Sequence, residues 1–201
     1  MRKRLFIILA LAIVGYFSWK KSKTINFNRA IEVGEAIDSL NGVIVYYNGG
    51  VAHVKDRNLS KDGYNIGMRW QCVEFIKRYY YQYYHHKMPD TYGHAKHFFD
   101  ASLEDGGLNK ARNLIQLSNP SADQPTVGEI LVIGASWTNK YGHVAIISKV
   151  SETEVEIIQQ NSGPFGASRI TIPLFFDPIT QKWMLQKNYV KGRLKINEVG
   201  N

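Results

Sequence analysis

The sequence predicts an α+β fold in which helices come first and an antiparallel β-sheet follows. Apolar and aromatic residues recur at helical spacing after residue 69, at Trp70, Val73, Ile76, Tyr80 and Tyr84. From Pro125 the apolar period changes to two, which predicts strands at 127–133, 142–150 and 154–161. A helical part followed by a strand meander is typical of an α+β domain rather than of alternating β-α units.

The N-terminal segment 1–23 is expected to be a membrane anchor or a signal segment. Leu5–Trp19 is an apolar run without charge, and basic residues flank it on both sides, at Arg2, Lys3, Arg4, Lys20, Lys21 and Lys23. The run is shorter than the about 17–25 residues of most spanning helices. It also lacks the small-residue site at which signal peptides are cleaved. We expect an uncleaved anchor through residues 5–19, with a cleaved signal peptide and a cytosolic apolar helix as alternatives.

Composition and charge describe one globular domain that does not bind nucleic acid. The 201 residues are 44% hydrophobic and 21% charged, which is enough to form a substantial core. The net charge is +8, but six positive charges lie in residues 1–23, which contain no acid. The rest of the chain therefore carries only +2, with basic and acidic residues interleaved.

The other expected elements complete the domain organisation. Residues 24–40 are expected to form a linker and a short helix, with apolar residues at Ile31, Val33, Ile37 and Leu40, before a domain at 41–197. Within that domain we expect a strand at 43–47, a loop at 55–67, helices at 92–103 and 107–114, and weaker strands at 170–172 and 182–185.

Cys72 is the candidate nucleophile. It falls in the first turn of the helix that begins near Trp70, where free backbone N–H groups and the helix dipole stabilise a thiolate. We therefore expect Cys72 to react with iodoacetamide faster than a free thiol at pH 6. It is the only cysteine, so no internal disulfide can form, and an inert buried cysteine is the alternative.

Among the six histidines, His143 is the candidate base for this thiol. It opens an otherwise apolar strand directly after Gly142. If 143–150 pairs with 154–161 through a three-residue turn, His143 lies opposite Asn161 with Gln159 as a diagonal neighbour. A histidine that is satisfied at a strand edge is the structural alternative.

The remaining histidines are less suitable as a base for Cys72. His85 and His86 follow Cys72 on the same helix at a distance of roughly 20 Å. Asp90, His94 and His97 lack a further donor for a metal site, so neither a metal nor another cofactor is expected. His53 has no evident partner.

Three segments together resemble the CHAP family of cysteine amidohydrolases and peptidases. They are Trp70-Gln71-Cys72-Val73-Glu74-Phe75, Gly142-His143-Val144-Ala145-Ile146-Ile147 and Gln160-Asn161. The likeness is greatest to the amidase half of glutathionylspermidine synthetase/amidase and covers residues 40–195. It implies a papain-like fold, with Cys72 at a helix start and His143 on the sheet. It also implies catalysis through a thiolate–imidazolium pair and an acyl-enzyme.

One position departs from the family pattern. Gln159 stands where the family usually has a glutamate two residues before the asparagine. Its carbonyl oxygen can orient His143 but cannot stabilise imidazolium by charge. The backbone N–H of Cys72 and the side chain of Gln71 are candidate oxyanion donors, and Asn161 is expected to steady the adjacent loop.

These residues predict an amidase of the bacterial cell envelope, either anchored by its N-terminus or secreted. Its expected substrate is a peptide amide, with peptidoglycan favoured because of the N-terminal segment. A glutathionylspermidine-type amidase is one alternative. A wall-binding module with weakened catalysis is another, because Gln159 replaces the expected glutamate.

Overall fold

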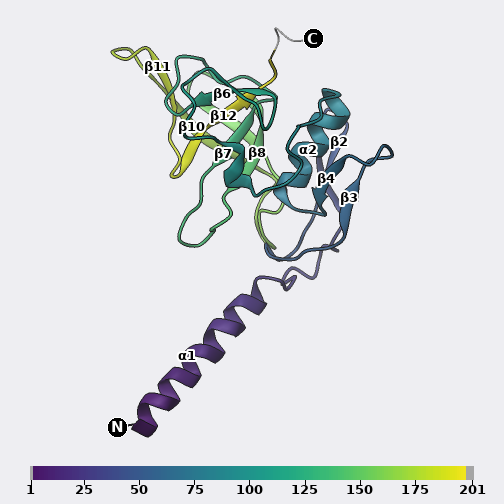
Figure 1. The fold of residues 1–201 in the computed structure, drawn as a ribbon, viewed down its shortest axis with the longest axis vertical. Coiled ribbons are helices and arrows are strands. Elements are labelled where there is room, and N and C mark those ends of the chain that lie inside the picture. Colours follow the sequence, from purple (N-terminus) through teal and green to yellow (C-terminus); the bar gives the residue numbers. More distant parts are fainter. Residues whose placement is uncertain (1, 198–201) are drawn as a thin grey trace.

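The structure is a computed structural model and describes residues 2–197. The helix α1 (Arg2–Ser22) projects away from a domain that contains all the other elements (Figure 1). The side chains of residues 3–21 are exposed, although most of them are apolar. The span Lys3–Ser22 is long and apolar enough to cross a membrane. At 1.5 Å per residue it covers about 30 Å, the thickness of a bilayer's hydrocarbon core.

An eight-stranded antiparallel sheet organises the domain, in the order β11-β10-β9-β8-β7-β12-β6-β5. Its strands are β5 (Gly107–Asn109), β6 (Leu114–Ser118), β7 (Ile130–Ile133), β8 (His143–Val150), β9 (Glu154–Ile158), β10 (Arg169–Asp177), β11 (Lys182–Leu185) and β12 (Val190–Lys195). The last strand lies between β6 and β7 and pairs with both. Two small hairpins stand apart from this sheet, β1 (Ala36–Leu40) with β2 (Val43–Tyr46) and β3 (Arg57–Leu59) with β4 (Asn65–Met68).

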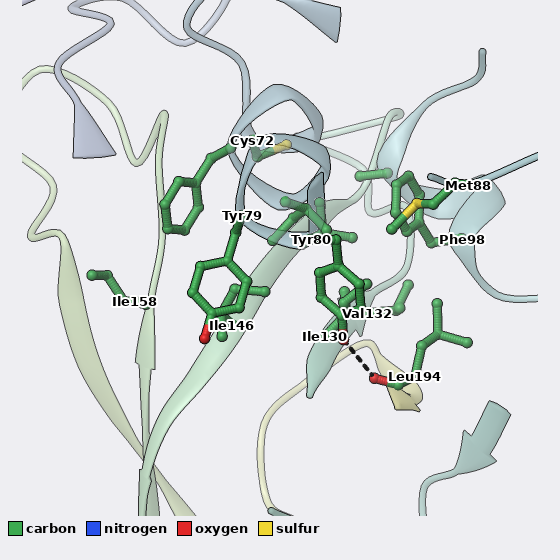
Figure 2. Packing of buried hydrophobic residues seen from close by; sticks show 14 of the residues in the cluster. Cys72, Tyr79, Tyr80, Met88, Phe98, Ile130, Val132, Ile146, Ile158 and Leu194 are labelled. Atoms are coloured by element: carbon green, nitrogen blue, oxygen red, sulfur yellow. Dashed lines mark hydrogen bonds between the residues drawn. The ribbon is translucent and has the colours of Figure 1, made fainter. Parts of the chain in front are cut away.

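Helix α2 (Cys72–Tyr83) covers one face of the sheet. Its aromatic side chains pack against alternate strand residues such as Val144 and Ile146, and Cys72 lies in the same buried cluster (Figure 2). The intervening residues Ala145 and Ile147 belong to a second apolar cluster. This alternation follows from the pleat of a strand that is buried on both faces. The α+β architecture expected from the sequence is therefore confirmed, with α2 as the helix that packs on the sheet.

The helix expected within 24–40 is wrong, because residues 36–40 form strand β1. Leu40 pairs with Val43 across Asn41-Gly42, and both turn residues have positive φ, at 50° and 80°. Asn-Gly is the most favoured sequence for a two-residue hairpin turn of this kind. That signal outweighs the helical spacing of Ile31, Val33, Ile37 and Leu40.

Three further local predictions are also corrected. The segment 92–103 contains only a 3-10 turn, η1 (Ala95–Phe98), and soon afterwards the Asp100 carboxylate accepts hydrogen bonds from Ser102, a side-chain turn that competes with helix. The segment 107–114 forms β5 and the start of β6, which pair with each other, and β6 also pairs with the distant strand β12. The loop expected at 55–67 contains the β3–β4 hairpin.

The β8–β9 hairpin has the predicted partners but a different turn. Val150 pairs with Val155, so the connection is one residue longer than expected. A bulge at Ser148 compensates, and Ile146 pairs with Ile158. The bulge thereby restores the register that brings His143 near Gln159.

Candidate active site

Cys72 is the first residue of α2. Gln71 precedes it in an extended conformation, with φ −78° and ψ 159°, and its side chain does not cap the helix. Uncapped first-turn N–H groups are free to stabilise negative charge. The backbone N–H groups of Val144, Val73 and Cys72 itself interact with the sulfur. The contact with Val144 places the thiol beside the start of β8, one residue from His143.

Burial controls the ionisation of this thiol. Cys72 is only 8% exposed, and burial raises the pKa of the thiol more strongly than the three N–H groups lower it. The resting group is therefore a thiol at neutral pH. The expectation of fast alkylation at pH 6 is not supported by these surroundings.

His143 begins β8 and is oriented by Gln159. The Nε2 atom of His143 lies 2.9 Å from Oε1 of Gln159. The Nε2 group of Gln159 donates to the carbonyl oxygen of Ala167 at 3.0 Å, which sets the orientation of the amide because a carbonyl only accepts. The imidazole proton must then be on Nε2, and Nδ1 has a free lone pair with which to accept a proton.

The imidazole is neutral in this environment. Burial lowers the pKa of His143 to about 4, the Gln159 hydrogen bond opposes that shift, and the positive charge of Lys187 adds to it. A raised thiol pKa beside a lowered imidazole pKa favours a neutral pair at neutral pH. This differs from the thiolate–imidazolium pair expected from the family resemblance, and the missing carboxylate at position 159 is one physical reason.

Gln71 and Asn161 belong to one polar network next to the nucleophile. Asn161, with φ 64°, donates from Nδ2 to Oε1 of Gln71 at 2.8 Å and to the carbonyl of Val51 at 3.0 Å. Gln71 donates from Nε2 to the carbonyl of His53 at 2.7 Å. The buried Asn48 donates to Oδ1 of Asn161 at 2.9 Å. Asn161 thus joins the loop 51–53 to the start of α2, and the Gln71 amide is held beside Cys72.

A buried charged network behind the nucleophile was not predicted as part of the site. Arg78 donates from Nε to Oε1 of Glu74 at 2.7 Å, and both side chains are buried. Gln160 donates to Oε2 of Glu74 at 2.8 Å and to the carbonyl of Gln71 at 3.0 Å. The network therefore holds the N-terminus of α2 against the end of β9. The i,i+4 spacing of Glu74 and Arg78 is the sequence signal that could have identified it.

His86 and His97 have local hydrogen-bond partners. His86 bonds to the carbonyl of Arg112 at 2.8 Å, and His97 accepts from the backbone N–H of His94 at 3.1 Å. Within residues 2–197, no group of three or more His, Cys, Asp or Glu side chains is arranged to hold a metal.

Residues 63–161 match the CHAP domain family. The chain contains a CHAP domain. The matched span includes Cys72, His143, Gln159 and the Gln71–Asn161 contact. CHAP domains are papain-like and are cysteine-dependent amidases or peptidases, so this is a CHAP domain amidohydrolase.

A second comparison finds a distant relative. The chain is 30% identical over 105 residues to the glutathionylspermidine synthase of Crithidia fasciculata. The aligned part is 49% of this chain but only 14% of that protein. The CHAP domain therefore corresponds to a small part of the relative's length.

Proposed function

We propose that the protein hydrolyses an amide bond with Cys72 as nucleophile and His143 as base. The observation that carries this proposal is the arrangement of Cys72, His143 and Gln159. The Cys72 sulfur contacts the Val144 N–H next to His143, and Gln159 holds the far side of the imidazole. These contacts supply a nucleophile, a base with one free nitrogen, and a group that orients the base.

The reaction begins from the neutral pair. As the Cys72 sulfur bonds to the amide carbonyl carbon, its proton moves to Nδ1 of His143, and the C=O π electrons move onto the oxygen. The proposed donors to that oxyanion are the Cys72 backbone N–H and the hydrogen of the Gln71 amide that His53 does not use. Imidazolium then protonates the departing amine as the C–N bond breaks. This leaves a thioester, and His143 activates a water that hydrolyses it.

The proposed substrate is peptidoglycan, cleaved at a stem-peptide or glycan–peptide amide. The exposed apolar helix α1 supports this choice, since a helix that acts as an anchor or export signal would bring the domain to the cell envelope. The similarity to a glutathionylspermidine synthase favours a second candidate, glutathionylspermidine amide hydrolysis. A wall-binding role with weakened catalysis is the third, and rests on the uncharged Gln159.

The test uses the full chain in detergent, incubated separately with purified peptidoglycan and with glutathionylspermidine, followed by mass spectrometry of the products. The control is Cys72→Ala. New amino and carboxyl termini released from peptidoglycan only by the wild type support the proposal. Cleavage of glutathionylspermidine alone would show that the second candidate, and not peptidoglycan, is the substrate. Binding of peptidoglycan by both proteins without any products supports the wall-binding role.

A further inference from the structure

The end of α1 is attached directly to the domain. The carbonyl of Lys23 accepts a hydrogen bond from the backbone N–H of Ala52 at 2.9 Å, and Nζ of Lys23 donates to the carbonyl of Thr138 at 3.3 Å. Gly50 lies so close to this segment that an added Cβ would collide with the Lys23 carbonyl oxygen. The chain therefore packs onto the domain within one or two residues of the helix end, and no long linker separates them.

The segment that receives α1 also belongs to the candidate active site. Ala52 lies between Val51 and His53, and the carbonyls of these two residues accept hydrogen bonds from Asn161 and Gln71. Gln71 immediately precedes the nucleophile. The site is thus at the end of the domain from which α1 leaves, whereas β11 lies at the far end (Figure 1).

Two aromatic side chains project into solvent from loops at this end. Trp137 is 97% exposed and is followed by Thr138, the residue that Lys23 contacts. Phe165 is 75% exposed and follows Pro164, whose carbonyl accepts hydrogen bonds from Asn28 and from Tyr47. Further exposed apolar residues accompany them, at Ile25, Phe27, Val51, Val54 and Tyr141. A group of this kind on one end of a domain marks a surface that is covered by an apolar partner.

We infer that this end of the domain docks on the bilayer that holds α1, with Trp137 and Phe165 in the headgroup region. The inference rests on the anchor in the proposed function. Tryptophan is the side chain most suited to the membrane interface, because its ring is apolar and its N–H remains hydrated. Lys20, Lys21 and Lys23 lie at the end of α1, and Lys140 lies in the loop that contains Trp137. Their positive charges complement anionic headgroups.

Docking in this orientation restricts the substrate class. In this orientation the candidate active site lies next to the membrane surface, so the amides closest to it belong to molecules held at that surface. A lipid-linked peptide or the membrane-proximal layer of a polymer meets this condition. A freely diffusing substrate has no advantage at such a site.

The experiment measures tryptophan quenching in the full chain, reconstituted into vesicles of phosphatidylcholine with a minority of phosphatidylglycerol. The phosphatidylcholine is brominated near the glycerol end of its acyl chains, and bromine quenches only nearby indoles. Trp19→Phe removes the anchor's own tryptophan. The emission of this variant should be quenched in brominated relative to unbrominated vesicles. Adding Trp137→Phe should abolish most of that quenching, whereas adding Trp183→Phe on β11 should leave it in place.

The outcomes distinguish docking of the domain on the bilayer from insertion of α1 into it. If Trp19→Phe shows no quenching while Trp137→Phe, which retains Trp19, is quenched, α1 is inserted but the domain does not dock. The same fluorescence result is expected if Trp137 contacts a soluble substrate instead of the bilayer, and it overturns the docking inference. If neither variant is quenched, the anchor is wrong and the inference fails with it. Loss of amidase activity would change neither fluorescence result.

Discussion

Replacing Gln159 with glutamate should raise the pKa of His143 and shift the site toward a thiolate–imidazolium pair. The wild-type pKa is lowered to about 4, and Gln159 contributes a hydrogen bond at 2.9 Å without charge. A carboxylate within hydrogen-bonding distance shifts such a pKa by roughly 1–3 units. The His143 pKa in Gln159→Glu should therefore lie between about 5 and 7.

The pH–rate profile tests this shift. In the wild type, protonation of His143 removes the base, so the acid limb should lie near pH 4. In Gln159→Glu the limb should move upward with the His143 pKa. Gln159→Met keeps the volume but removes the acceptor, and should lower kcat/KM by about 10- to 1,000-fold without moving the limb upward. Nitrogen-15 NMR of the imidazole measures the same pKa without a substrate.

The pH dependence of the free energy of unfolding gives a second measurement of the His143 pKa. Because the folded pKa of His143 is below its usual 6.5, the unfolded state binds more protons between pH 4 and 6.5. The free energy of unfolding should therefore rise with pH across that window, by on the order of 1–3 kcal/mol for a partly exposed ring. Gln159→Glu should flatten the rise. An acid limb and an imidazole pKa that both stay near 4 in Gln159→Glu would refute this account of the site.

Three further changes have distinct outcomes. Cys72→Ala should abolish hydrolysis and change the free energy of unfolding by only about 1 kcal/mol, as measured by urea denaturation. Glu74→Gln leaves Arg78 buried without its charge partner and should destabilise the fold by about 3–5 kcal/mol, whereas Asp56→Asn in an exposed pair should cost less than about 1 kcal/mol. Burial lowers the pKa of Lys77 to about 8, so wild-type stability should rise between pH 8 and 10, and Lys77→Met should remove that rise. Equal slopes in the two proteins would contradict the Lys77 prediction.

Local patterns predicted the parts of the fold that depend on local order. The start of α2 and the strands β7 to β9 follow from helical and alternating spacing, because α2 packs one face on the sheet and the strand residues alternate between two apolar clusters. The contact of His143 with Gln159 followed from parity and register. These features required no knowledge of distant residues.

Long-range pairing is what the sequence could not supply. Strand β6 lies between its neighbour β5 and the distant strand β12, and its pairing with β12 spans more than seventy residues. The ionisation of the Cys72 thiol also depends on the whole fold, since the helix dipole favours a thiolate while burial raises the thiol pKa. Asn48 and Gln160 act in the site through contacts with residues far along the chain, at Asn161 and Glu74.

The position of β12 has a consequence for how the protein is made. Until Val190–Lys195 has been synthesised, β6 and β7 have no strand between them, so the sheet stays divided. The apolar helix α1, in contrast, precedes every strand of the sheet in the chain. The complete sheet can therefore form only late, because β12 must pair with both β6 and β7 across long stretches of sequence. In a chain exported or anchored through α1, as proposed above, this order of strands delays closure of the sheet until most of the chain has been translocated.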